Sequence, residues 1–133
     1  MRLWHQKLIE HLPGKQLLGQ HRECCALRGL GWGKPHSVVN YVFKHPYINL
    51  YEYHLRVISE MIHRGYNVDS KWLDKEFRGK TRGYDNSEFT QNVNQLIIKP
   101  TNYIIYPEHN YEYLIECLNN LINKGIDISY ILD

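Results

Sequence analysis

The chain has 133 residues, the length of one domain, and its 43% apolar, 13% aromatic and 23% charged residues exclude a disordered or low-complexity protein. No apolar run approaches the ~20 residues of a membrane span, the first twelve residues lack the apolar stretch of a secretory signal, and three cysteines are too few for a disulfide framework. We therefore expect a cytoplasmic protein. The net charge of +2 is uneven: residues 1–50 carry +5 and residues 83–133 carry −5, which favours an anionic partner for the N-terminal part.

The first predicted helix runs from about Lys15 to Arg28, after the turn signal Pro13-Gly14. At 100° per residue its apolar side chains gather on one side, with His21 among them: Leu17, Leu18, Cys24, Cys25 and Leu27. Glu23 points to the opposite side, which it shares with Gly19 and Ala26. These small residues either leave room for a ligand or mark the place where another element packs.

A glycine-rich stretch, residues 29–35, ends this helix. It is not a Walker A loop, because the G-x-x-x-x-G-K-[ST] spacing is absent and Pro35 follows the lysine. Two interpretations remain open: a phosphate contact through Lys34, or a plain connector.

Two further helices are predicted, one from within residues 46–50 to Gly65 and one from about Glu108 to Lys124, which Gly125 ends. Between them, Val93–Ile98 and Tyr103–Tyr106 are short apolar runs that form either short strands or irregular packed segments. The expected fold is mainly α: one compact domain, residues 1–133, of three main helices with long irregular connections and at most a few short strands.

These two helices resemble each other at an offset of 60 residues. Tyr51-Glu52-Tyr53 matches Tyr111-Glu112-Tyr113, and Gly65 matches Gly125, within the segments 51–68 and 111–128. Either a helix–turn unit was duplicated, or two amphipathic helices with the same cap converged.

Motifs of common enzymes are absent: there is no H-E-x-x-H, no G-x-S-x-G and no G-x-G-x-x-G. The eight histidines lack metal-ligand spacing, so no metal site is predicted. What remains is His21-Arg22-Glu23 on the first helix, within the basic part of the chain.

Several segments, in order along residues 1–80, resemble the pyrimidine dimer DNA glycosylase family of the phage endonuclease V type. They are Met1-Arg2-Leu3-Trp4, Gln16-Leu17-Leu18 with Arg22-Glu23, the stretch from His36 through Tyr41 to Arg64-Gly65-Tyr66-Asn67-Val68, and Glu76-Phe77-Arg78-Gly79. The resemblance implies a compact domain of three main helices, and residues beyond Gly83 match poorly.

The resemblance also implies a mechanism in which an N-terminal amine attacks C1′ of the damaged nucleotide and a nearby glutamate assists. An α-amine, with a pKa near ~8, is more often neutral than a lysine. By resemblance, Met1 carries the amine because Arg2 occupies the place that follows it, and Glu23 is the glutamate. DNA contacts are expected from Arg2, Arg22, Arg28, Lys34 and His36. The expected partner is double-stranded damaged DNA, bound by a monomer that needs no cofactor.

Two other interpretations stay open. One is a catalytically silent, nucleic-acid-binding relative that keeps Arg22 and Glu23 for structure. The other is a small helical protein-interaction module that uses the acidic tail and the tyrosine-rich helices. If the protein is a glycosylase or a silent DNA-binding relative, DNA is expected to meet the N-terminal side. Residues 83–133 are then expected to face away or to complete the core.

Overall fold

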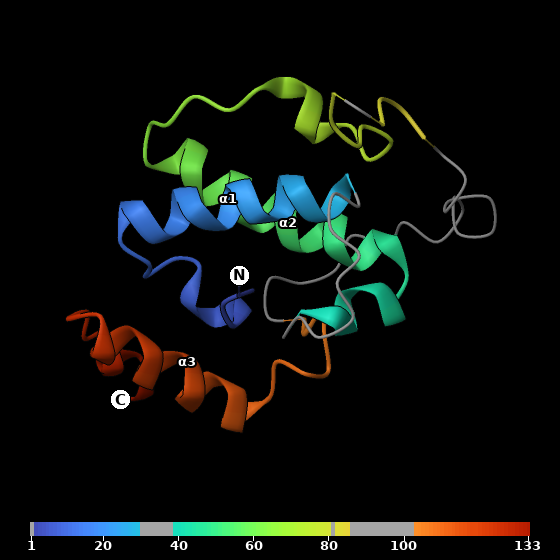
Figure 1. The fold of residues 1–133 in the computed structure, drawn as a ribbon. Helices are drawn as coiled ribbons and strands as arrows, with labels where there is room; N and C mark the ends of the chain where they lie inside the picture. Colours follow the sequence, from blue (N-terminus) through green and yellow to red (C-terminus); the bar gives the residue numbers. More distant parts are fainter. Residues whose placement is uncertain (1, 30–38, 81, 86–102) are drawn as a thin grey trace.

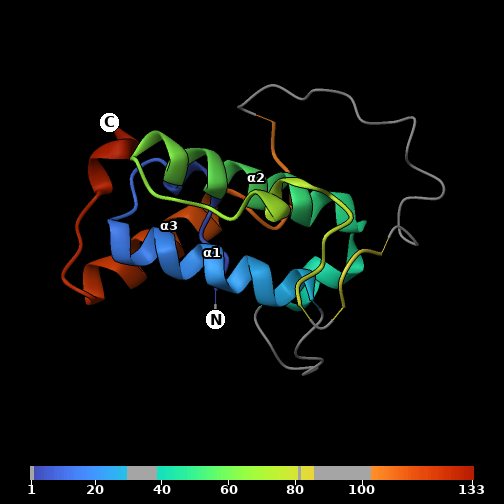
Figure 2. The same cartoon turned by 90° about the horizontal axis from the view of Figure 1, so that it is seen from above.

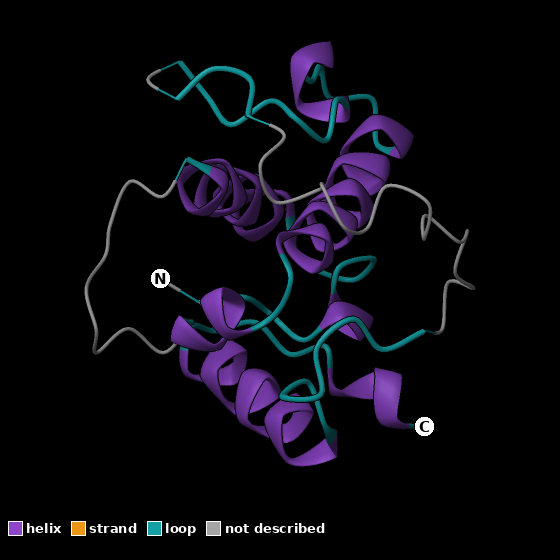
Figure 3. Cartoon of the chain, turned by 90° about the vertical axis from the view of Figure 1, so that its right-hand side faces the viewer, coloured by secondary structure: helices purple, strands orange, loops and turns teal. Residues whose placement is uncertain are grey.

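Three α-helices organise the chain: α1 (Gly14–Arg28), α2 (Tyr47–His63) and α3 (Tyr111–Asn123) (Figure 1). The computed structural model describes residues 2–29, 39–80, 82–85 and 103–133. Short 3-10 turns precede α1 at Gln6–Leu8, lie between the helices at Asn40–Lys44 and Ser70–Leu73, and follow α3 at Ser129–Leu132. Within the described ranges the only β-type pairing is one isolated antiparallel bridge, Phe77 to Tyr84, and Figure 3 shows helices and loops alone. The predicted mainly α, single-domain fold is confirmed.

Proline and asparagine determine where the helices begin. Pro13 and Pro46 occupy the N-cap positions of α1 and α2, where the missing N–H costs no hydrogen bond. At α3 the side-chain oxygen of Asn110 accepts the Tyr113 N–H at 2.9 Å. This cap explains why α3 begins at Tyr111 rather than at the predicted Glu108.

Helices α2 and α3 end in the same way. Gly65 and Gly125 have φ values of +90° and +82°, and the following N–H groups of Tyr66 and Ile126 reach back to carbonyls five residues earlier, each at 2.9 Å. This is the Schellman arrangement, which favours glycine because a Cβ is strained at positive φ. The sequence similarity at an offset of 60 residues therefore corresponds to a shared C-terminal cap.

The segment from residue 2 to residue 12 lies between helices α1 and α2 on one side and α3 on the other (Figures 1 and 2). Leu3 and Leu8 are both 0% exposed, as are Leu17 of α1 and Leu121 of α3. The segment is thus the middle of the core that holds the three helices together.

The two apolar runs between α2 and α3 have different outcomes. Val93–Ile98 lies outside the described residues. Tyr103–Tyr106 is irregular and packed, with Ile105 and Tyr106 buried. None of the described helices combines the length and the apolar composition that crossing a membrane requires.

Candidate active site

Residues 2–4 run alongside α1 and are bound to two of its polar side chains. The Arg2 N–H donates to Glu23 Oε2 at 3.1 Å. The amide of Gln20 donates from Nε2 to the Arg2 carbonyl at 3.0 Å and accepts the Trp4 N–H on Oε1 at 2.7 Å. Gln20 and Glu23 are three residues apart, so they share one face of the helix. The backbone of Arg2 and the Glu23 carboxylate are therefore adjacent.

Gln20 has every hydrogen-bonding position occupied. Its Nε2 also donates to Glu23 Oε2 at 3.2 Å, and its Oε1 lies 2.9 Å from the Tyr53 hydroxyl, whose one proton it shares with the Trp4 carbonyl. The two donors and the two acceptor sites of the amide are thus used, which fixes the orientation of the group. The side chain is 1% exposed, so this network excludes water.

Two tyrosine hydroxyls hold the same segment from the other helices. Tyr53 of α2 donates to the Trp4 carbonyl, and Tyr113 of α3 donates to the Leu3 carbonyl, each at 2.5 Å. These tyrosines are equivalent positions in the offset-60 similarity. The sequence showed the pairing of Tyr53 with Tyr113, but no sequence signal assigned them to the site.

Glu23 is a half-buried carboxylate. Burial raises the pKa of Glu23, while the Arg2 N–H and the Gln20 amide oppose this by stabilising the charged form. Both of these bonds end on Oε2. Within the described part of the chain Oε1 accepts no hydrogen bond.

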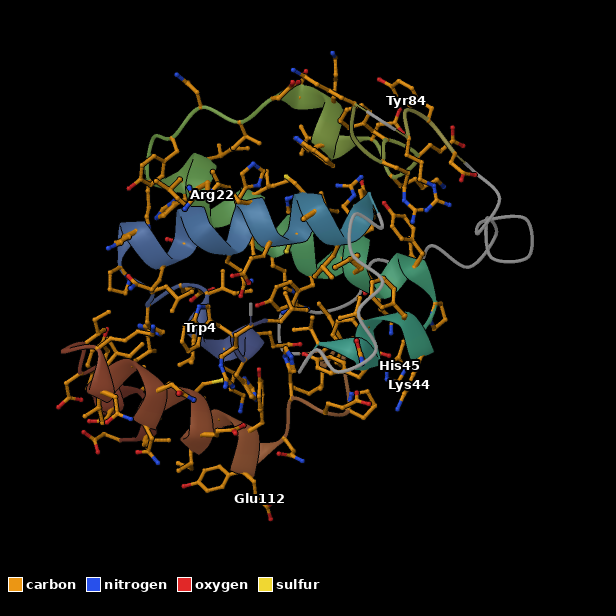
Figure 4. All side chains as sticks on the ribbon, viewed as in Figure 1. Trp4, Arg22, Lys44, His45, Tyr84 and Glu112 are labelled. Carbon is orange, nitrogen blue, oxygen red and sulfur yellow. The ribbon has the colours of Figure 1, made fainter. Side chains whose placement is uncertain are left out.

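The expected basic residues have different environments. Arg22 is exposed on α1 and lies on the other side of that helix from Trp4 (Figure 4). The Arg2 guanidinium is half-buried, lies 3.7 Å from Glu116 and sits about 6 Å above the rings of Trp4 and Tyr113 (6.0 and 5.9 Å). Met1, Lys34 and His36 lie outside the described residues.

The expectation that Arg28 contacts DNA is wrong, because this side chain is 0% exposed. Its five N–H groups are all donated inside the protein: to the Tyr47 hydroxyl, to His54 Nδ1, and to the carbonyls of Trp72, Asp74 and Phe77 at 2.8–3.0 Å. Arg28 therefore fastens the segment after α2 to the end of α1.

A second cluster lies between α1 and α2, where ligand atoms of His21, Cys25 and His54 come within 4.8 Å of one another. A guanidinium only donates, so the Arg28 contact at 3.0 Å makes His54 Nδ1 an acceptor and leaves the proton on Nε2. That proton faces His21 Nδ1 at 2.8 Å. A metal-bound histidine usually donates through its second nitrogen, whereas His54 accepts there, so the cluster has the protonation pattern of a hydrogen-bonded chain.

This cluster is also poorly suited to ionise. Burial lowers the pKa of both His21 and His54, and Arg28 lowers them further. Burial raises the pKa of Cys25 to about 12, so its thiol is neutral and weakly reactive. Sequence spacing missed this cluster because His54 comes from a different helix.

Comparison with known proteins supplies the family. A family model described as pyrimidine dimer DNA glycosylase matches residues 1–74, more than half of the 133-residue chain. No curated protein and no solved structure matches the chain. The matched residues include Arg2, Gln20, Glu23 and Tyr53. The chain belongs to the pyrimidine dimer DNA glycosylase family.

Proposed function

We propose that the protein is a DNA glycosylase with AP-lyase activity on damaged DNA, with pyrimidine dimers as the lesion, and that the amine of Met1 is the nucleophile. The observation that carries this proposal is the 3.1 Å hydrogen bond from the Arg2 N–H to Glu23. The amino nitrogen of the preceding residue is three bonds from the Arg2 nitrogen. Covalent geometry therefore keeps it within roughly 7 Å of the carboxylate, whatever the conformation of that residue.

The proposed steps use the amine and the carboxylate in turn. The amine forms a bond to C1′ while the glycosidic bond breaks and the base leaves with a proton, and the sugar ring opens to give an imine. Ionised Glu23 stabilises the positive charge that develops on the sugar. A proton is then removed from C2′, the bond from C3′ to its phosphate oxygen breaks, and water hydrolyses the imine. Oxygen Oε1 of Glu23 is the free acceptor for these proton transfers.

Access to C1′ requires a nucleotide to leave the base stack. We propose that phosphate contacts from Arg2, Arg22, Lys34 and His36 supply much of the binding energy. The affinity for DNA should then fall steeply as the salt concentration rises.

The test is borohydride trapping with the untagged chain, whose first residue is checked by mass spectrometry. Duplexes with an abasic site and with a cyclobutane pyrimidine dimer are the substrates, and borohydride reduces the imine to a stable secondary amine. We expect a covalent adduct at residue 1 with both duplexes. Glu23→Gln should lower the single-turnover rate by about 100-fold or more, because a general acid–base group contributes on this scale.

A matched control is Glu10→Gln, which removes the same charge from an exposed position near the start of the chain and should leave the rate unchanged. An extension that blocks the amine should abolish the adduct. Absence of an adduct with the untagged chain, together with salt-dependent DNA binding, would identify a silent DNA-binding relative and contradict the proposal.

A further inference from the structure

The start of the chain is held in an unusual way. Residues 2–4 contain six backbone N–H and C=O groups, and five of them are bound to side chains of Gln20, Glu23, Tyr53 and Tyr113. A strand normally satisfies such groups by pairing with another strand. Here three helices contribute one or two side chains each, so the position of this segment depends on a few individual hydrogen bonds.

We propose that Gln20, Tyr53 and Tyr113 are positioning residues that hold the backbone of residues 2–4 in register with Glu23. This inference rests on the proposed function, because its purpose is to direct the N-terminal amine. The three residues do not touch the reacting atoms. They determine where the amine begins its attack.

The need for such residues follows from chain physics. The first residues of a domain are usually loose unless something ties them down, whereas nucleophilic attack requires reacting atoms at about 3–3.5 Å in one orientation. Tyrosine has few rotatable bonds, so a buried ring with one hydroxyl contact positions a carbonyl at a low entropic cost. Tyr53 is 0% exposed, and its ring is locked in the core.

The geometry also explains why both tyrosines are needed. Tyr113 holds the Leu3 carbonyl from α3, and Tyr53 holds the Trp4 carbonyl from α2. The two helices lie on opposite sides of the segment (Figure 1), so each carbonyl is held from a different side. Tyr53 and Tyr113, which are equivalent positions at an offset of 60 residues, therefore hold the two carbonyls from different helices.

The test uses the full untagged chain and removes single oxygen atoms. Tyr53→Phe, Tyr113→Phe and the double variant lose the hydroxyl and keep the ring. Tyr51→Phe is the matched control: it lies on α2, and its hydroxyl donates to the Leu73 carbonyl at 2.5 Å, away from residues 2–4. Single-turnover trapping on abasic duplex and the Kd for the same duplex are measured for each variant, together with thermal unfolding.

We expect Tyr53→Phe and Tyr113→Phe to lower the trapping rate by about 10- to 100-fold, while the Kd stays within about twofold and Tyr51→Phe behaves like the wild type. Hydrogen exchange of the Arg2 and Trp4 amides should also become faster in the two variants, but not in Tyr51→Phe. Equal rates in all three variants would overturn the proposal, and so would a loss of rate that is matched by a loss of affinity.

Gln20→Glu provides a second, isosteric variant with a pH readout. It keeps an oxygen for the Trp4 N–H and the Tyr53 hydroxyl, but it removes the N–H donor to the Arg2 carbonyl and to Glu23. It also places a second carboxylate beside Glu23, which disfavours ionisation of the pair. In a plot of the trapping rate against pH, the rate falls at low pH as Glu23 takes up a proton. This acidic limb of the profile should move to higher pH in Gln20→Glu. Gln16→Glu, one helical turn earlier, adds the same charge and should leave the limb in place. An unmoved limb in Gln20→Glu would contradict the role of Gln20.

The two proposals fail in different ways. If wild-type protein forms no adduct, the proposed function is wrong, and the amide exchange of residues 2 and 4 still shows whether the three side chains hold the segment. If the wild type forms the adduct and the tyrosine variants match Tyr51→Phe, only the positioning role is wrong.

Discussion

At the scale of one residue, the position of Glu23 lowers the stability of the fold. Its carboxylate is half-buried, and burial raises its pKa, so the folded chain holds the charged form less readily than the unfolded chain does. Two hydrogen bonds from Arg2 and Gln20 reduce this cost and leave one oxygen free. Its position therefore costs folding free energy, as expected of a carboxylate in the catalytic role proposed for Glu23.

This conflict predicts the effect of Glu23→Gln on stability. A glutamine oxygen can accept the same two hydrogen bonds without carrying a buried charge, so the variant should unfold at the same temperature as the wild type or at a higher one. Thermal unfolding at neutral pH, measured beside the trapping assay, checks this expectation. A clear loss of stability together with the loss of activity would show that Glu23 holds the fold instead.

Arg28 and Gln20 show what sequence reasoning reached at this scale. Helical periodicity placed Glu23 on the side opposite the apolar residues, whereas in the structure Glu23 is half-buried and shares a face with buried Gln20. The same periodicity puts Arg28 on the apolar side, near Cys24 and His21, so its burial could have been anticipated. Periodicity could not predict that polar Gln20 is buried, because its partners are backbone groups of residues 2 and 4 and a hydroxyl from α2.

At the scale of elements, helix ends were the most predictable features. Proline and glycine signal them through local backbone geometry, which does not depend on the rest of the fold. The start of α3 was predicted three residues too early because the Asn110 cap competes with a longer helix. The packing of residues 2–12 between the helices could not be predicted, since it depends on contacts between distant segments.

We expect the substitution of alanine for glycine to have opposite effects on stability at Gly65, which ends α2, and at Gly19, which lies inside α1. Gly65→Ala should lower the free energy of unfolding by about 1 kcal/mol, because an alanine is strained at a φ of +90° although its Cβ meets no atom within 4 Å. Gly19→Ala should raise it by about 0.5–1 kcal/mol, because Gly19 is inside α1 and the nearest atom to an added Cβ is 3.7 Å away.

Urea unfolding at one pH measures both variants. Gly65→Asn provides the control, since asparagine tolerates positive φ better than alanine and should lose less stability. Equal effects of alanine and asparagine at residue 65 would mean that the C-terminal cap of α2 does not limit stability.

At the scale of the whole molecule, α3 belongs to the acidic C-terminal part of the chain and contacts the basic N-terminal part. Its buried side chains, Leu114, Cys117, Leu118 and Leu121, complete the core, as expected for the acidic C-terminal part. The helix does not simply face away, however, because Tyr113 and Glu116 reach the surroundings of Leu3 and Arg2. The N-terminal segment is therefore held by residues from both the basic and the acidic parts of the chain.

Histidines in the same core make the stability of the protein depend on pH. Burial lowers the pKa of His5, His21, His54 and His109, and it brings that of His109 to about 3. The His109 ring stacks with the rings of His5 and Tyr113. His54 accepts a hydrogen bond from Arg28. Protons that bind these rings must therefore disturb the packing around the site.

The last prediction follows from the direction of these shifts. The unfolded chain binds protons on these histidines below about pH 6.5, whereas the folded chain does not until the pH is lower. Stability should therefore be full above pH 6.5 and fall as the pH drops, by up to about 3 kcal/mol per pH unit from His54 and His109 alone. Urea unfolding between pH 7.5 and 5.5 should show this slope.

His109→Gln should reduce the slope by the contribution of about one proton, since glutamine does not titrate and can still contact the Tyr41 hydroxyl. His63→Gln, at an exposed position, should leave it unchanged, and an equal reduction in both variants would mean that acid acts through surface charge and not through the core.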